Sequence, residues 1–469
     1  MSSKNIFILA AMVAALLLAA PSASAVTLNE AREMYRAGDF EGALPTFLEE
    51  IKRKPKDASL NQWVGVCLMQ AGRHDEAIPR LKFAHSKGVI EAPRYLAEIA
   101  FQKYDFDGAD EYIDLYEAAL KKAKKSMPDE IADLRRRVRL AGNMLDRVEK
   151  IVIIDSVAVD REEFFKIYRL SPGAGSINSV DILPDDCDYA DPTTVFMPET
   201  QSVMLWAAPS DNDEYLIMES NKLFDGSWEK AHILDDAINI SGDNNFPFLM
   251  PDGVTLYYAN NGDGSIGGYD IFISRKEENS FLQPQNIGMP YNSPYDDYML
   301  AIDEITGVGW WATDRNQMED SITIYKFIPS DLRKNYDADD DNLVDKARIT
   351  DYRSTWEDGK DYAEILQKID RIELNRNSKK KEFAFALPGG RVYTRMSDFR
   401  STRAKALMEE YLDAVEEFKA NEETLLKLRT KYRNGDRSLI DTIKNLEQKL
   451  DTDRGILKQK ANAVISQEN

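Results

Sequence analysis

Apolar residues recur in three different ways along the chain, and the changes of period divide it into segments. Before residue 150 they follow steps of three and four residues, which is the helical period, as in Ile131, Leu134, Val138 and Leu145. From Ile151 onward, short apolar runs such as 152–154 and 164–170 lie between Asp, Pro and Gly residues, as expected of β-strands. A helical spacing returns from Met396. The pattern predicts helices over 26–150, strands over 151–395 and helices over 396–469.

The first helical segment contains an internal repeat. Gly38 and Gly72 are 34 residues apart, and so are Ala43 and Ala77. Such a repeat needs a small residue where its two helices cross and larger apolar residues around it. The matching positions are Ala31, Met34, Gly38, Ala43, Phe47 and Pro55 in the first repeat, Gly65, Leu68, Gly72, Ala77, Leu81 and Ala84 in the second, and Leu96, Ala97, Tyr104, Ala109, Ile113 and Tyr116 in a weaker third.

This period resembles that of the TPR family over residues 27–122. The resemblance implies an α-solenoid whose groove binds peptides or partner helices. A further helix, opened by Pro128, is expected to cap the array, because a terminal repeat must cover an apolar face. The aromatic residues Tyr35, Trp63 and Tyr95 are expected to pack in the core.

One segment of the strand-rich region carries a specific turn. Residues 244–260 read as a strand that ends at Pro251-Asp252-Gly253 and a second strand that begins at once. The layout recurs with substitutions, since Met197, Met250 and Ile302 are 53 and 52 residues apart. It resembles the PD40, or WD40-like, repeat and implies a β-propeller-like domain over 151–395. Clear blades are expected at 181–240, 241–292 and 293–345, with 151–180 and the strand pair at 382–394 supplying further blades or closing the ring.

The C-terminal segment predicts two helices that fold back on each other. Apolar residues spaced by threes and fours lie on both sides of a break at Asn434-Gly435. They are Leu407, Tyr411, Ala414, Phe418, Leu425, Leu428 and Tyr432 before it, and Leu439, Ile443, Leu446, Leu450, Leu457 and Val464 after it. We expect an antiparallel helical hairpin, a coiled coil, over 396–469. The fold class is therefore a multidomain α + β protein with a solenoid, a propeller-like domain and a hairpin.

The chain begins like an exported protein. Residues 1–25 contain the three parts of a cleaved signal peptide. These are the basic Lys4, the apolar stretch 6–20 and the small residues Ala23-Ser24-Ala25. No second long apolar run follows, so direct membrane insertion is not expected. A periplasmic location is predicted, peripheral to the outer membrane only through a partner. Cys67 and Cys187 fall in unrelated segments and are expected to be a buried thiol and a separate one, although a disulfide between them stays open.

Charge is concentrated in the middle of the chain, where 151–345 holds 11 basic and 37 acidic residues. Such a field repels phosphate backbones and anionic lipids, which argues against a nucleic-acid partner. The acidic loops either keep the domain soluble or attract cations or a basic partner surface.

Candidate chemistry is sparse. Of three histidines, His74 and His85 lie in the helical array, so that His232 alone is left for nucleophile–histidine catalysis. Carboxylates spaced as in a calcium loop occur at Asp337, Asp339, Asp341 and Asp345, but Asn342 and Arg348 stand where such a loop needs Gly and Glu. We predict a solvated acidic loop rather than a metal site. No catalytic residue and no cofactor are predicted.

The order of signal, TPR repeats and PD40 blades resembles the periplasmic TPR–PD40 proteins of Bacteroidota, a family with a member in type IX secretion. This chain has no lipid-attachment cysteine at its signal, and a hairpin stands where an OmpA-like peptidoglycan-binding domain would be. The resemblance implies a non-enzymatic scaffold that holds proteins of an outer-membrane or secretion assembly through its TPR groove, propeller rim or hairpin. The alternative is a carbohydrate-binding or glycan-processing protein that uses the central propeller face.

Overall fold

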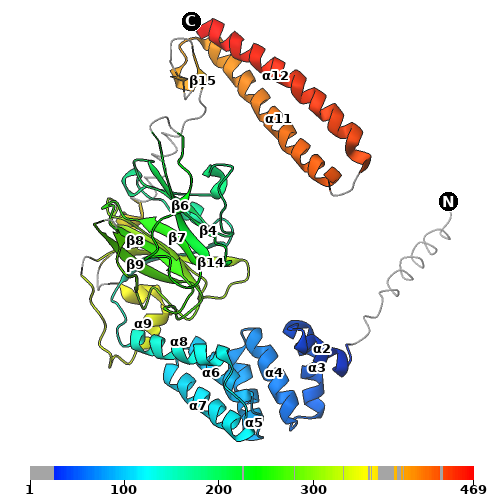
Figure 1. The fold of residues 1–469 in the computed structure, drawn as a ribbon, viewed down its shortest axis with the longest axis vertical. Coiled ribbons are helices and arrows are strands. Elements are labelled where there is room, and N and C mark those ends of the chain that lie inside the picture. Colours follow the sequence, from blue (N-terminus) through cyan, green and yellow to red (C-terminus); the bar gives the residue numbers. More distant parts are fainter. Residues whose placement is uncertain are drawn as a thin grey trace, which may run out of the picture. The chain divides into compact units, whose positions relative to one another are not determined.

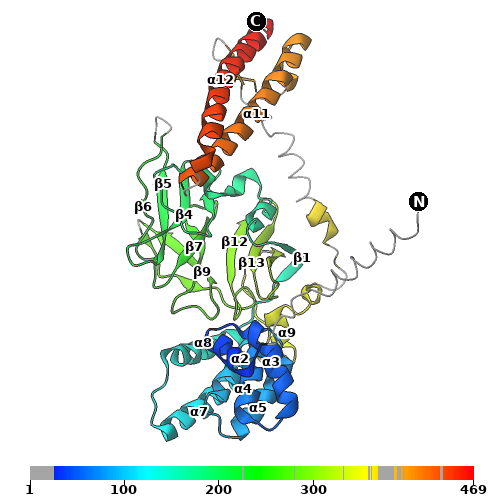
Figure 2. The same ribbon diagram turned by 90° about the vertical axis from the view of Figure 1, so that its right-hand side faces the viewer.

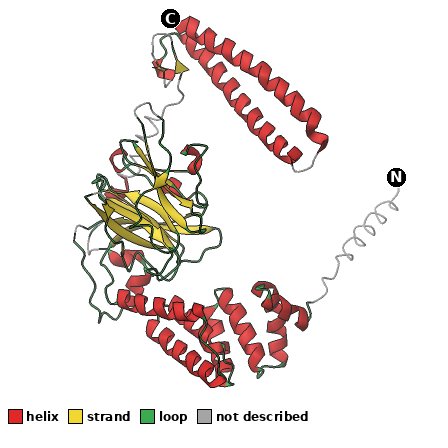
Figure 3. Ribbon diagram, in the orientation of Figure 1, coloured by secondary structure: helices red, strands yellow, loops and turns green. Residues whose placement is uncertain are grey.

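The chain is mixed in secondary structure: helices, then antiparallel sheets, then helices again (Figure 1, Figure 3). The computed structural model describes residues 26–223, 227–278, 280–330, 332–356, 360, 362–367, 385–387, 392–393, 396–433 and 437–468. Two compact units divide the chain, Met1–Asp370 and Arg371–Asn469. The predicted signal peptide lies outside the described residues. Within the described part, no helix is both long enough and apolar enough to cross a membrane.

Seven helices open the described part of the first unit. They are α2 (Leu28–Arg36), α3 (Phe40–Arg53), α4 (Ala58–Gln70), α5 (His74–Ser86), α6 (Ala92–Gln102), α7 (Phe106–Ala123) and α8 (Asp129–Leu145). Side chains cap several of them, since Asp39, Asp57 and Asp105 each accept a backbone N–H of the helix that follows. The helix predicted after Pro128 is present as α8, with Ile131, Leu134 and Val138 buried.

Three successive helix pairs share the same turn and the same crossing contact. The turn residues Gly38, Gly72 and Tyr104, which are 34 and 32 residues apart, all have a positive φ, of 85°, 69° and 62°. Ala43, Ala77 and Ala109 follow each turn by five residues and are fully buried. Gly65 has no room for a side chain, because an added Cβ would lie 2.7 Å from Leu81. The recurrence therefore holds in three dimensions, and Tyr104 adopts the conformation of the glycines it replaces.

Three antiparallel sheets follow the helices (Figure 2). Sheet 1 has the order β2 (Ser176–Asn178), β3 (Val195–Met197), β4 (Val203–Pro209), β5 (Tyr215–Asn221) and β6 (His232–Ile233). Sheet 2 runs from β7 (Asn244–Leu249) through β8 (Thr255–Asn260) to β9 (Asp270–Glu277), which pairs with both β10 (Ser280–Phe281) and β11 (Gln285–Asn286). Sheet 3 contains β12 (Asp297–Asp303), β13 (Val308–Thr313), β14 (Ser321–Ile328) and the early strand β1 (Val152–Asp160).

The predicted turns occur at equivalent places in the three sheets. Gly253 has a φ of 67° and donates its N–H to Met250, while the Asp252 carboxylate accepts from the next two amides, as the Pro-Asp-Gly sequence predicts. Gln201 and Gly307 also have positive φ in the turns of sheets 1 and 3. Each of the three expected segments, 181–240, 241–292 and 293–345, therefore contains most of the strands of one sheet.

Residues 151–180 have two separate roles. β1 pairs with β14 from Val152–Ile328 to Asp160–Ser321, so a strand from the start of the domain completes the last sheet. The chain after β1 then fills the space between the sheets, where Phe164 and Tyr168 are buried against Phe246, Tyr298 and Trp310. This segment was expected to close the ring or add a blade. It closes sheet 3 and supplies part of the common core.

The array and the sheets share a core within the first unit. Ile266, Met289, Leu343 and Ala347 belong to the same buried apolar cluster as residues of α6, α7 and α8. Backbone hydrogen bonds from Glu149 to Met289 and from Lys150 to Lys334 join the end of the array to the β-region. The short helix α9 (Leu343–Arg348) packs against α8. The predicted cap of the array is thus itself covered by the next part of the chain.

The second unit is a helical hairpin with a small sheet. α11 (Thr402–Arg433) and α12 (Ile440–Glu468) pair along the predicted seam, with Leu425, Ile443 and Leu450 buried. β15 (Phe385–Ala386) pairs with β16 (Val392–Tyr393), and among the described strands neither pairs with any other. Phe385 and Tyr393 pack on Phe399, Met408 and Val464 of the same unit. The strand pair expected to extend the propeller, part of which lies outside the described residues, therefore belongs with the hairpin, because its aromatic side chains are buried there.

Candidate functional site

One face of the helical array is built by every second helix and carries charged and aromatic side chains. We call it the α2–α4–α6–α8 face, after the helices that supply Arg32, Tyr35, Trp63, Arg94, Tyr95, Glu98 and Arg137. At its start the Arg32 guanidinium lies 5.0 Å from the Trp63 ring centre. The Tyr35 ring is 6.4 Å from Trp63, and Trp63 in turn is 5.5 Å from the buried Phe47. The aromatic residues thus rest on the core with one side and remain partly exposed on the other.

Neighbouring polar groups and ion pairs continue this face to α6 and α8. The Tyr35 and Tyr95 hydroxyls lie close to each other. Arg94 lies over the Tyr95 ring at 5.1 Å and within 3.6 Å of Glu98. On α8, Arg137 pairs with Asp133 at 2.9 Å. Four helices are therefore connected by side chains that also reach the surface.

Two guanidinium groups of this face have hydrogen-bonding capacity left over. The Nε atoms of Arg32 and Arg94 are buried and have no hydrogen-bond acceptor. For Arg94, the 3.6 Å to Glu98 allows electrostatic attraction but is too long for a hydrogen bond. A buried donor without an acceptor costs about 1–3 kcal/mol, so such groups normally have a partner. Both Nε atoms are covered from solvent, so a bound molecule can reach only the other N–H groups of these two arginines.

Glu98 makes the charge of this face sensitive to pH. Burial raises the pKa of Glu98 above its ordinary value, and the guanidinium groups of Arg94 and Arg137 oppose the shift without cancelling it. Protonation of Glu98 would leave Arg94 with less negative charge beside it.

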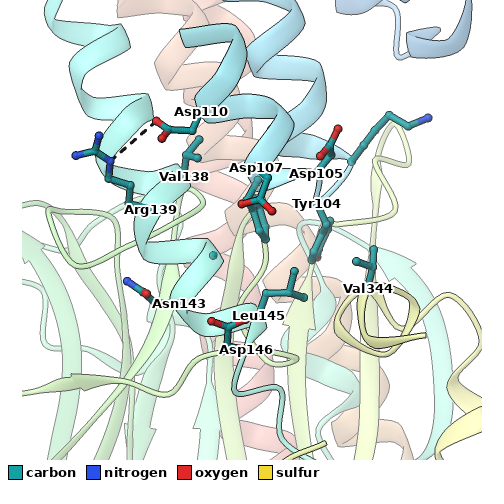
Figure 4. Close-up of a pocket in the computed structure, with 13 residues that line it drawn as sticks. Tyr104, Asp105, Asp107, Asp110, Val138, Arg139, Asn143, Leu145, Asp146 and Val344 are labelled. Atoms are coloured by element: carbon teal, nitrogen blue, oxygen red, sulfur yellow. Dashed lines mark ion pairs between the residues drawn. The ribbon is translucent and has the colours of Figure 1, made fainter. Parts of the chain in front are cut away.

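A pocket lies where the array meets the rest of the first unit (Figure 4). Its volume is about 810 Å³, and it is lined by the α6–α7 turn, by α7 and α8, and by Val344 of α9. Asp105 and Asp110 of this lining already have structural roles. Asp105 accepts the Gly108 N–H at the start of α7, and Asp110 is 4.0 Å from Arg139. The lining contains no histidine, cysteine, serine or threonine among the described residues.

A buried ion pair lies behind that pocket. The Arg315 guanidinium donates to the Asp297 carboxylate at 2.6 Å and to the carbonyls of Pro290 and Tyr291. Tyr104, from the array, is almost fully buried against this group, and burial raises the pKa of its hydroxyl, partly offset by Arg315. The ion pair therefore stiffens the part of the β-region that receives the array. Sequence reasoning did not find it, because Asp297 and Arg315 match no motif.

The acidic loop before α9 uses part of its charge internally. Asp340 pairs with Lys346 and accepts the Asn342 N–H, and Asp345 accepts the Thr350 hydroxyl at 3.1 Å. Asp337, Asp339 and Asp341 are exposed. Nowhere in the described part of the chain do three His, Cys, Asp or Glu side chains gather in a way that would hold a metal ion.

His232, Cys67 and Cys187 are the remaining reactive side chains that the sequence singles out. His232 is exposed and lies 3.7 Å from Glu219 and 3.6 Å from Glu229. Cys67 and Cys187 are free, so the disulfide left open by the sequence does not form. Burial raises the pKa of the Cys67 thiol to about 12, which keeps it protonated.

Tyr35, Trp63 and Tyr95 pack against the core, as the sequence predicts. All three are nevertheless only partly buried and lie on the α2–α4–α6–α8 face. Helical spacing places them toward the core, yet it does not tell a fully buried ring from one with an exposed side.

No protein-family model matches this sequence, and no curated protein matches it.

Proposed function

We propose that this protein is a non-enzymatic scaffold of a bacterial cell envelope that holds an extended segment of another protein on the α2–α4–α6–α8 face. The observation that carries the proposal is the placement of two partly exposed arginines, Arg32 and Arg94, over the partly exposed rings of Trp63 and Tyr95. Carbonyl or carboxylate oxygens of a bound peptide accept from the exposed N–H groups of these arginines, and the partly exposed rings of Trp63 and Tyr95 supply apolar contact.

The architecture that we infer agrees with such a role. The recurring turn and crossing residues support a TPR-type solenoid, in which each helix pair contacts mainly its neighbours and leaves a long face open. The three sheets, with β1 closing the last one, support a propeller-like domain. The signal-like residues 1–25 support export to the periplasm, and the partners we infer are envelope proteins rather than nucleic acid.

The non-enzymatic part of the proposal rests on how the acidic side chains are used. Asp252 accepts two turn amides, and Asp270 accepts the N–H groups of Ile266 and Gly267. Both carboxylates are engaged in stabilising turns.

Two matched double variants test the proposal in capture experiments from solubilised envelopes. Arg32→Ala/Arg94→Ala removes the two arginines that lie over the rings of the face, and Arg53→Ala/Arg73→Ala removes two exposed arginines outside the face. We expect the first variant to lose at least tenfold of a specific co-purifying protein, and the second to retain it. Equal recovery with both variants, at unchanged thermal stability, contradicts the proposed face.

A further inference from the structure

A second pocket lies on sheet 1, away from the α2–α4–α6–α8 face. Its volume is about 390 Å³, and Trp206, Met218 and Trp228 are among the side chains that line it. Trp206 is fully buried and is fixed by a hydrogen bond from its Nε1 to the Asp188 carbonyl at 2.9 Å. Trp228 is only partly buried. The pocket therefore has a rigid aromatic base and one aromatic wall that reaches solvent.

Exposed apolar side chains surround this pocket. Tyr189 follows the lining residue Asp188 and is 48% exposed, and Ile233, which pairs with Met218 across β5 and β6, is 41% exposed. Leu223, whose backbone N–H bonds the residue before Trp228, is 45% exposed. A folded protein rarely leaves several large apolar side chains around one pocket unless the surface meets a partner.

The rim of the pocket is acidic. Residues 181–191 hold five aspartates and no lysine or arginine, and two of these, Asp186 and Asp188, line the pocket. Neither carboxylate has a hydrogen bond or an ion pair within the described part of the chain. Burial raises the pKa of the Cys187 thiol between them, and both carboxylates raise it further. Lys230 is the one cation in the described lining.

We infer that this pocket is a docking site for a protein segment that carries one large apolar side chain flanked by lysine or arginine. The apolar side chain enters between Met218 and Trp228, over the layer that the fully buried Trp206 supports, as buried anchors do at protein interfaces. The flanking cations then pair with Asp186 and Asp188, whose charges are unbalanced. Charge complementarity selects this occupant, because an acidic rim repels anionic lipids, nucleic acids and acidic peptides.

Selection from a random heptapeptide phage library on the immobilised full-length protein tests the assignment. We expect enriched sequences with one aromatic or large aliphatic residue next to lysine or arginine. Their affinity for Asp186→Lys/Asp188→Lys should fall at least tenfold. Asp339→Lys/Asp341→Lys is the matched control, because it reverses two exposed carboxylates of the same spacing that do not line the pocket. It should bind as the wild type does.

Cys187 supplies a second measurement that reports on the pocket itself. Because Cys67 is buried and Cys187 lines the pocket, a small thiol reagent reads out Cys187. A saturating selected peptide should slow its labelling at least tenfold in the wild type, and should not change the low labelling of Cys67.

Any of four peptide results would overturn the assignment: no enrichment, enriched sequences without the basic and apolar pattern, equal affinity for both charge-reversed variants, or unprotected Cys187. A fifth result would do the same: self-association that Asp186→Lys/Asp188→Lys abolishes would give the surface to a second copy of the chain. None of these variants touches the α2–α4–α6–α8 face, so the outcome is independent of the function proposed above.

Discussion

Single residues of the helical array were largely predictable from the sequence, whereas their exposure was not. The 34-residue period identified Gly38, Gly72 and Ala77, and the third, shorter repeat still places Tyr104 in the turn with a positive φ. A period follows from backbone geometry that each repeat must satisfy by itself. Exposure of Tyr35 or Trp63 depends on which neighbouring helices cover it, and a single repeat holds no information on that.

Two helical glycines should respond in opposite ways to the same substitution. Gly65→Ala places a Cβ 2.7 Å from Leu81 and should lower the free energy of unfolding by about 1–3 kcal/mol. At Gly142 an added Cβ meets nothing closer than 4.0 Å, so Gly142→Ala should be neutral or stabilise α8 by up to about 1 kcal/mol. Urea unfolding of both variants measures the difference, and equal effects would mean that the α4–α5 crossing is wrong.

The Arg315–Asp297 ion pair should be costly to break from one side. Arg315→Met leaves the Asp297 carboxylate buried without its cation and should cost about 3–5 kcal/mol. The double variant Arg315→Met/Asp297→Asn should recover part of that loss, because no unpaired charge remains. Arg275→Met, at an exposed arginine, serves as control and should be near neutral in the same urea titration. A double variant no more stable than Arg315→Met would argue against the pairing.

Secondary-structure elements were predicted well where the signal is local and poorly where the partner strand is distant. The Pro251-Asp252-Gly253 turn fixes its two strands within a few residues. By contrast, the assignment of β15 and β16 depends on which unit buries Phe385 and Tyr393, and a strand pair of this kind looks the same in either place. The pairing of β1 with β14 spans more than 160 residues and left no mark in the local pattern.

The end of α12 should stabilise the beginning of α11 in a pH-dependent way. Partial burial raises the pKa of Glu468, but the hydrogen bonds that its carboxylate accepts from the Arg400 and Ser401 N–H groups lower it. The net result is a pKa below the ordinary value. A lowered carboxyl pKa stabilises the folded form above the ordinary pKa, and this contribution is lost as pH falls through the folded-state value.

Hydrogen exchange of the first turn of α11 provides the measurement. At pH 7, Glu468→Gln should speed exchange there severalfold relative to the wild type. Glu409→Gln, which changes an exposed residue of α11, should not. The difference between Glu468→Gln and wild type should shrink once the pH falls below the folded-state pKa of Glu468. A difference that persists in acid would show that carboxylate charge is not responsible.

At the scale of the whole molecule, the division into units changes what a truncation should do. A cut after Arg403 would remove the predicted hairpin seam, Leu407 to Val464. The structure places Phe385, Tyr393 and Phe399 in one cluster with Met408 and Val464, so that cut exposes three aromatic side chains. The division after Asp370 is the better boundary.

Truncation after Asp370 should therefore leave the first unit folded, with its strand content and main unfolding transition unchanged. Truncation after Arg403 should instead produce a protein prone to aggregation. Circular dichroism and sedimentation velocity on both proteins distinguish the outcomes. If the two truncated chains behave alike, the strand pair is not part of the hairpin core.

Site-specific photo-crosslinking tests the central claim most directly, because it reports which surface touches a partner. A photoreactive phenylalanine analogue in place of Tyr95 lies on the α2–α4–α6–α8 face, and the same analogue in place of Phe83, a partly buried ring of α5, lies on another helix row. The account predicts a discrete crosslinked protein from position 95 that disappears in the Arg32→Ala/Arg94→Ala background, and none from position 83. Crosslinks of equal yield from both positions, or an adduct unaffected by loss of the two arginines, would contradict it.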